Sequence, residues 1–218
     1  MKNSKMKYVI LYIIALIPII VTIIFYNKLP DQYPIHWNIQ GQVDNYGGRS
    51  SSLMTASVPL IIILLMQVLP LIDPKKRNYE NFKGSYYNFQ LMFAILMGAL
   101  HLLTLSAAIG YEFIKVDSGV KLLIAVLFTV IGNLMPKFKH NYFIGIKTPW
   151  TLASEEVWFA THRLGGKLWF YGGLIMIVFS FIPGTVSAGI YFAVIMGSSI
   201  YMLLYSYLIF RKLQRGVK

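Results

Sequence analysis

Residues Leu53–Ile72 read LMTASVPLIIILLMQVLPLI, and the basic cluster Lys75-Lys76-Arg77 follows this stretch after a short gap. The twenty residues contain no Asp, Glu, Lys or Arg. As a helix they would rise about 30 Å, which is the thickness of the hydrocarbon core of a bilayer. The stretch therefore predicts a membrane-spanning helix, and the basic cluster indicates which of its ends faces the cytosol.

Similar apolar stretches recur along the whole chain, in which 56% of residues are hydrophobic and only 13% are charged. Such a composition is atypical of a soluble domain. Helices are favoured because lipid offers the backbone no hydrogen-bond partner, and because the runs lack the alternation of barrel strands. Two of the six stretches, Val120–Met135 and Leu168–Pro183, are short for a span. The other three are Tyr8–Tyr26, Tyr87–Tyr111 and Val186–Phe210.

The basic residues fall on alternate sides of these stretches, with 16 of the 20 Lys and Arg in four segments. By the positive-inside rule these four segments, which include both termini, face the cytosol. We therefore expect an all-α polytopic helix bundle in the cell membrane, with six transmembrane helices and both termini cytoplasmic. The basic residues of the four segments are Lys2, Lys5, Lys7, Lys75, Lys76, Arg77, Lys83, Lys137, Lys139, Lys147, Arg163, Lys167, Arg211, Lys212, Arg215 and Lys218.

The net charge of +12 is divided among several loop ends and accompanies no nucleic-acid recognition motif. It predicts contact with membrane lipid and no direct contact with nucleic acid. The chain divides into residues 1–52, an N-terminal helix with an outward loop, residues 53–119, helices two and three, and residues 120–218, helices four to six with a cytoplasmic loop at 136–167.

The predicted spans carry no ionisable residue near their centres except His101, which argues against an ion-coupled carrier. Two interpretations of His101 remain open. It could relay protons, or it could be a neutral imidazole that hydrogen-bonds within the bundle to Gln67, Gln90 or Thr104. The chain has no cysteine, which excludes disulfides and Cys-based metal sites.

The first loop, which faces outward, combines aromatic residues with turn residues. Ile35–Asn38 reads as a short strand, whereas residues 38–41 and 44–48 read as turns. The aromatics could simply lie at the headgroup level, or the loop could form a surface that senses a peptide. His36 with Asp44 is too small a set for a zinc site. The candidate sensing residues are Pro34, Ile35, His36, Trp37, Asn38, Gly41 and Asp44.

The fourth loop, residues 136–167, predicts one short amphipathic helix on the cytoplasmic side. Ser154 or Thr151 can cap it, its first turn holds two carboxylates, and the Gly165-Gly166 pair is expected to end it after Leu164. The loop is a candidate surface for a cytosolic partner or for lipid. Its candidate residues are Lys139, Asn141, Gly145, Lys147, Thr148, Pro149, Trp150, Trp158, His162 and Arg163.

Two parts of this loop, NLMPK at 133–137 and NYFIGIKTPWTL at 141–152, together with Glu156-Val157-Trp158 and Thr161-His162-Arg163, resemble the signature of the SdpI family. These are bacterial multi-spanning membrane proteins named for immunity to a sporulation-delaying toxin. The first loop, from Leu29-Pro30 through the Ile35–Asn38 run, is similar to a small domain of unknown function often found at the start of that family.

The resemblance implies an integral membrane protein that protects the cell against a secreted membrane-active peptide toxin. It also implies a sensor role, in which a cytosolic transcriptional repressor is recruited to the membrane when toxin is bound. It implies no catalysis and no cofactor. The alternatives are a small-molecule or ion transporter and a membrane-embedded metal-dependent enzyme, although the inner loop lacks a His-Glu-x-x-His motif.

The last stretch carries Gly189, Ala193 and Gly197 at four-residue spacing. Small residues in this pattern let helix backbones approach closely. The approach could occur within one chain or between two copies, so the oligomeric state remains open.

Overall fold

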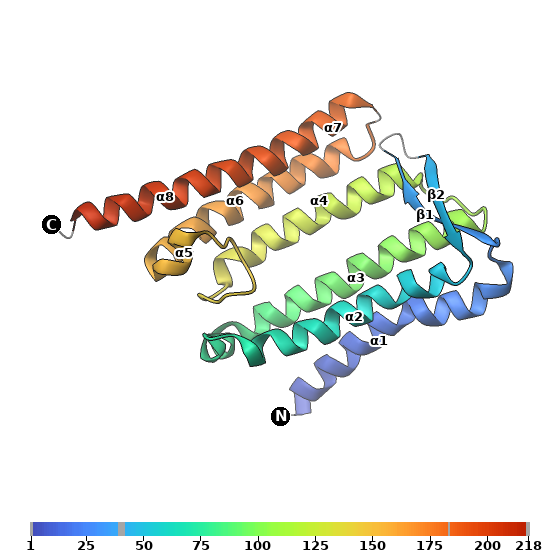
Figure 1. Cartoon of the computed structure of the whole chain (residues 1–218), viewed down its shortest axis with the longest axis horizontal. Coiled ribbons are helices and arrows are strands. Elements are labelled where there is room, and N and C mark those ends of the chain that lie inside the picture. The colour runs from blue at the N-terminus through green and yellow to red at the C-terminus, as the bar shows by residue number, and fades with distance from the viewer. Residues whose placement is uncertain (1, 39–41, 183, 217–218) are drawn as a thin grey trace. The chain divides into compact units, whose positions relative to one another are not determined.

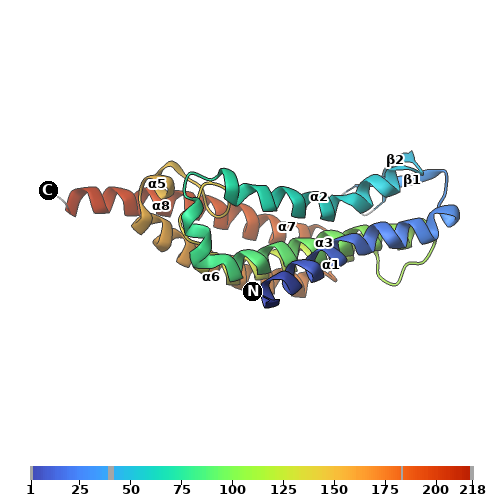
Figure 2. The same ribbon diagram turned by 90° about the horizontal axis from the view of Figure 1, so that it is seen from below.

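The computed structural model describes residues 2–38, 42–182 and 184–216 (Figures 1 and 2). The chain is mainly helical. In these ranges five helices are long and apolar enough to cross a membrane, namely Lys5–Lys28, Ser51–Ile72, Lys76–Ala108, Val116–Lys137 and Thr185–Arg215. The prediction of an apolar, helical membrane protein is therefore confirmed.

The helical elements follow one another with short connections. They are α1 (Lys2–Phe25), α2 (Ser51–Ile72), α3 (Lys83–Ala108), α4 (Val116–Leu134), α5 (Pro149–Ala153), α6 (Glu155–Phe179), α7 (Thr185–Phe192) and α8 (Ser198–Gly216). A π-helical segment, Ala193–Gly197, joins α7 to α8, and 3-10 turns cover Tyr26–Lys28, Lys76–Phe82 and Met135–Lys137. The chain forms two compact units, Met1–Gln67 with Gln90–Leu123 and Val68–Phe89 with Ile124–Lys218.

In the first unit, polar side chains join α1, α2 and α3 inside the bundle. His101 of α3 is 3% exposed. Its Nε2 lies 2.8 Å from Thr22 Oγ1 of α1, and its Nδ1 lies 3.1 Å from Thr55 Oγ1 of α2. A buried imidazole needs such partners, so these two hydroxyls satisfy His101 without any charge. The hydrogen-bonded interpretation of His101 is thus confirmed, but with partners other than the predicted ones.

The first unit also contains a β-hairpin, which the all-α prediction left out. Strand β1 (Gln32–Trp37) pairs antiparallel with β2 (Val43–Gly48), at the end of α1 and α2 (Figure 1). The predicted strand at 35–38 is confirmed in β1. The predicted turn at 44–48 is wrong, because the backbone of these residues pairs with β1. Pairing overrides the turn preference of Asp, Asn and Gly there.

In the second unit α6 runs beside α7 and α8, with α5 at its amino-terminal end (Figure 1). The expected break at Gly165-Gly166 is wrong, since α6 continues through both glycines to Phe179. A Cβ at Gly166 would lie 2.8 Å from the carbonyl oxygen of Gly132 in α4, and one at Gly165 would lie 2.4 Å from Met202 Sδ in α8. The pair therefore permits close helix packing rather than ending a helix.

The predicted short amphipathic helix is consequently the first half of a longer helix. The predicted span Leu168–Pro183 overlaps the apolar half of α6, which ends at Phe179, and Pro183 lies outside the described residues. Within the described residues α6 is not one of the five helices that are long and apolar enough to cross a membrane. Ser154 does cap α6 as predicted, because its hydroxyl accepts from the backbone N–H of Val157 at 3.3 Å.

Candidate functional site

The β-hairpin is a charged structure on its outer side. His36 of β1 pairs with Asp44 of β2, and Arg49 donates to the Asp31 carboxylate at 2.7 Å. The Asn38 side chain accepts from the backbone N–H of Gln42 at 3.0 Å and so helps to close the hairpin. These contacts join the two sides of the hairpin, with Arg49 and Asp31 at its base and Asn38 and Gln42 at its tip.

The inner side of β1 is buried against the helices of the first unit. Tyr33 is 1% exposed, and its hydroxyl lies 3.5 Å from Thr104 Oγ1 of α3. Tyr33 also packs with Leu29 and Leu105 in a small apolar core. This anchor fixes the position of the strand relative to α3.

Beyond Tyr33, the strand covers a cavity of about 340 Å³ within the first unit, here called the hairpin cavity. Residues 33–37 of β1 form its roof, and His101 and Thr55 lie on its polar side. The remaining walls are largely aliphatic, from Val58, Met97, Leu100 and Val120. An apolar cavity with a few convergent polar groups is typical of a binding site.

The structure brings most of the candidate residues of the first loop together. Pro34, Ile35, His36 and Trp37 all line the hairpin cavity. Asp44 lies on β2 and reaches the cavity only through its pair with His36. Asn38 lies at the end of β1, and Gly41 lies outside the described residues.

The helix residues of the cavity were not identified from the sequence as part of a site. Thr55 and Thr104 are hydroxyl-bearing positions in otherwise apolar helices, and this pattern is the signal that could have found them. Nothing in the sequence indicates that Met97 and Leu100 face the hairpin, because that depends on how α3 packs.

In the second unit, the loop at residues 136–154 is fixed by two buried polar side chains. Asn141 is fully buried, its Oδ1 accepts from the backbone N–H groups of Phe143 and Ile144 at 2.9 and 2.7 Å, and its Nδ2 donates to the Ile144 carbonyl at 3.0 Å. Asp73 is 2% exposed, and its carboxylate accepts from the backbone N–H of Tyr142 at 2.9 Å. Asn141 therefore shapes the loop from within.

His140 lies in the same loop and contacts the segment after α2. Its Nδ1 lies 2.7 Å from Lys75 Nζ, so the ammonium donates to a neutral imidazole. Burial, and then the positive charge of Lys75, lower the pKa of His140.

His162 and Trp158 lie in the first half of α6, where both bond to the loop at residues 136–154. The two rings stack with centroids 3.9 Å apart. His162 Nδ1 donates to the Trp158 carbonyl at 2.8 Å, and Nε2 accepts from the backbone N–H of Ile146 at 2.9 Å. His162 lies before the apolar part of α6, and burial lowers its pKa to about 4. The imidazole is thus neutral and fully hydrogen-bonded.

Gly145 and Thr148 complete the fit of the loop to the helices. Gly145 has φ of +118°, and a Cβ there would lie 2.2 Å from His162 Nε2. Thr148 caps α5 in a reciprocal pair with Thr151 and also lies 3.0 Å from Ser206 Oγ of α8. Pro149 occupies the first turn of α5, where its missing N–H costs nothing.

Five of the candidate side chains in this loop region instead lie at or near the surface. Lys147, Pro149 and Arg163 are exposed, whereas Lys139 and Trp150 are half-buried. Lys139 Nζ lies 5.2 Å from the ring centroid of Phe159, and Trp150 packs against Tyr207 with ring centroids 5.1 Å apart. These five side chains remain available to a partner.

Within residues 2–38, 42–182 and 184–216, no three His, Asp or Glu side chains lie close enough to hold a metal ion. His140 and His162 instead flank Trp158 and take up the hydrogen bonds described above.

The comparisons with known proteins agree with these two sequence regions. The SdpI/YfhL protein family model matches residues 137–206, and the Domain of unknown function (DUF1648) matches residues 13–65. The chain is 30% identical to Immunity protein SdpI of Bacillus subtilis (strain 168) over 213 residues, which cover 95% of this chain and 97% of that protein. No solved structure gives a significant match. The chain belongs to the SdpI/YfhL protein family.

Proposed function

We propose that the chain is a membrane immunity protein that protects its cell against a secreted membrane-active peptide. The observation that carries this proposal is the hairpin cavity, an apolar site roofed by β1 in the first unit. The relative with 30% identity is named as an immunity protein, which supports the same role. The role requires binding, without catalysis and without a cofactor.

The proposed topology has six spans in the cell membrane and both termini in the cytosol. The five apolar helices and the apolar half of α6 supply the spans, and the distribution of Lys and Arg supplies the orientation. In this orientation the β-hairpin meets the outer surface, where a secreted peptide arrives.

In the proposed mechanism, an apolar segment of the peptide enters the hairpin cavity from the membrane surface. The aliphatic walls gain stability by excluding water, at roughly 25 cal/mol per Å² of buried apolar area. Trp37 contributes a large ring at the rim, and Trp is enriched among residues that dominate binding energy. Inside the cavity, the Thr104 hydroxyl donates to the His101 carbonyl at 2.9 Å, and its oxygen can still accept a hydrogen bond from a ligand.

The sensor part of the proposal concerns the 136–154 loop and the start of α6. Asn141, Gly145, Thr148 and His162 would act as the buried framework. Surface residues would then contact a cytosolic repressor; these are Lys139, Lys147, Trp150 and Arg163.

A protection assay with two matched aromatic variants tests the immunity role. Trp37 lines the hairpin cavity, whereas Tyr46 lies on β2 of the same hairpin, is 52% exposed and does not line it. Sensitive cells expressing the chain are challenged with secreted peptides of the producing strain. We expect Trp37→Ala to lower, by about tenfold or more, the peptide dose that the cells survive. Tyr46→Ala should leave that dose unchanged.

Membrane fractions are blotted in parallel so that both variants are compared at equal protein level. Survival that is the same with and without the gene contradicts the immunity role. If both variants lose protection equally, the hairpin cavity is not the peptide-binding site, although the chain still acts in immunity.

A further inference from the structure

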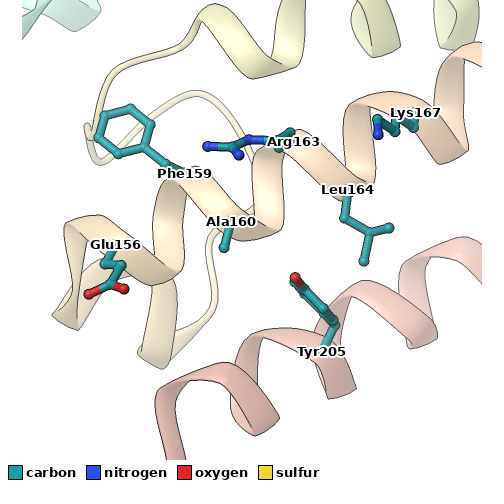
Figure 3. A pocket seen from close by; sticks show the side chains of 7 residues that line it. All are labelled: Glu156, Phe159, Ala160, Arg163, Leu164, Lys167 and Tyr205. Atoms are coloured by element: carbon teal, nitrogen blue, oxygen red, sulfur yellow. The ribbon is translucent and has the colours of Figure 1, made fainter. Parts of the chain in front are cut away.

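We propose that the second unit holds an anionic phospholipid between α6 and α8, in a site separate from the hairpin cavity and independent of the immunity role. The site has a basic end and an apolar end, and the two are continuous. Its basic end is a groove of about 540 Å³ lined by residues of α6 and by Tyr205 of α8 (Figure 3).

The basic end is suited to a phosphate. Arg163 and Lys167 lie one turn apart on α6, are both exposed, and have no ion-pair partner among the described residues. Tyr205 of α8 points toward Ala160 of α6 and lines the groove from the α8 side (Figure 3). Glu156 also lines the groove, about two helical turns before Arg163. The guanidinium of Arg163 and the ammonium of Lys167, which both line this groove, can form charge-assisted hydrogen bonds with a phosphodiester.

The apolar end continues from the same residues. A second groove of about 680 Å³ shares Leu164 and Lys167 with the first and follows α6 past Tyr171 to Ile175. Its other side is formed by the π-helical segment and the start of α8, including Gly197. Its length and apolar character suit an acyl chain.

The depth of the site also fits a lipid. Thr185–Arg215 is one of the helical regions apolar enough to cross a membrane, and its end carries Arg211 and Arg215. Tyr205 lies fewer than two turns before Arg211, so the basic groove falls at the headgroup level. The apolar groove then points into the hydrocarbon core.

The glycines of this region offer a matched pair of variants. Gly197 lines the apolar groove, and Gly189 lies in α7 outside it. A Cβ at either position would meet no atom of the described residues within 4 Å, so a side chain can begin at both without a Cβ clash. Gly197→Leu fills the groove, whereas Gly189→Leu adds the same side chain elsewhere.

Native mass spectrometry of the detergent-purified chain, titrated with palmitoyl-oleoyl phosphatidylglycerol, tests the proposal. We expect saturable binding of one lipid, with phosphatidylcholine of the same chains binding about tenfold more weakly. R163Q/K167Q should weaken phosphatidylglycerol about tenfold and should remove the preference over phosphatidylcholine. G197L should weaken both lipids, and G189L should weaken neither.

Several outcomes overturn the proposal. Equal lipid affinity of G197L and G189L would show that the apolar groove does not hold an acyl chain. An unchanged preference of R163Q/K167Q for phosphatidylglycerol over phosphatidylcholine would show that the basic groove does not hold the headgroup. Competition by glycerol phosphate at lipid-like concentrations assigns the basic groove to a soluble phosphate, and competition by a polyglutamate peptide assigns it to an acidic protein. Dimers that disappear in G197L would show that a second copy covers the groove.

Discussion

The hairpin at residues 32–48 and the loop at 136–154 carry the two sequence patterns of this chain, and they use polar residues in opposite ways. In the hairpin, His36 and Asp44 pair at the surface beside an open cavity. Asn141 of the loop and His162 of α6, which binds the loop, are completely buried and bond to backbone groups. The difference teaches that the polar residues of a motif can either contact a ligand or hold the backbone in place. Exposed polar residues are suited to the first role and buried ones to the second.

The largest expected effect comes from Gly145, where the loop backbone touches the His162 ring. Gly145→Ala places a Cβ 2.2 Å from His162 Nε2 at a φ of +118°. We expect it to destabilise the fold by about 3 kcal/mol or more, because both overpacking and backbone strain oppose it. Thermal unfolding in detergent and the amount of membrane-inserted protein measure this loss.

Gly184→Ala is the matched control for Gly145→Ala. Gly184 also has a positive φ, of +87°, but a Cβ there meets no described atom within 4 Å. It should cost about 1–3 kcal/mol from backbone strain alone, because φ of +87° with ψ of −166° is a conformation essentially limited to glycine. Equal effects of the two substitutions would mean that the contact with His162 has no role in holding the loop.

The neutral state of His162 predicts a pH dependence of the second unit. Its pKa is about 4 in the fold and about 6.5 in an unfolded chain, so the unfolded state binds more protons between these values. Stability is therefore complete above pH 6.5 and falls as the pH drops toward 4, by up to about 3 kcal/mol.

Unfolding midpoints at pH 7.5 and pH 5 for the wild type and His162→Gln measure this dependence. The substitution should reduce the shift between the two pH values, with a remainder from His140, whose pKa is also lowered. A shift that His162→Gln does not alter would show that another group titrates.

Asn141→Ala tests the loop framework without a steric clash. The substitution leaves the backbone N–H groups of Phe143 and Ile144 without their side-chain acceptor in a buried place. We expect a loss of about 2 kcal/mol, the usual cost of an unsatisfied buried hydrogen-bond group. Tyr142→Ala is the control, since that side chain is 42% exposed and its backbone N–H keeps its bond to Asp73. Chemical unfolding of both variants in the same detergent provides the comparison.

The sequence predicted the parts of the fold that depend on local pattern. Apolar length located the spans that became α1 to α4, and the Ser154 cap and the strand at 35–38 follow from residue type. Four of the predicted sensing residues of the first loop line the hairpin cavity, namely Pro34, Ile35, His36 and Trp37.

The features that sequence reasoning missed depend on contacts between distant segments. Gly165-Gly166 continues a helix because α4 and α8 pack against it, which no local rule contains. Asp73 fixes a loop 69 residues away through the Tyr142 backbone. The partners of His101 are threonines on two other helices. Each requires knowing which helix faces that segment.

The smallest expected effect on stability is at the surface pair of the hairpin. The side chains of His36 and Asp44 are 65% and 40% exposed, so water and salt screen their attraction. Asp44→Asn should therefore change the free energy of unfolding by less than about 1 kcal/mol, although it removes the charge that faces His36. If the hairpin senses a ligand, the same variant should alter protection at unchanged thermal stability. A large loss of stability in Asp44→Asn would show that the polar groups of the hairpin hold the fold, as those of the 136–154 loop do. The proposed difference between the two regions would then be wrong.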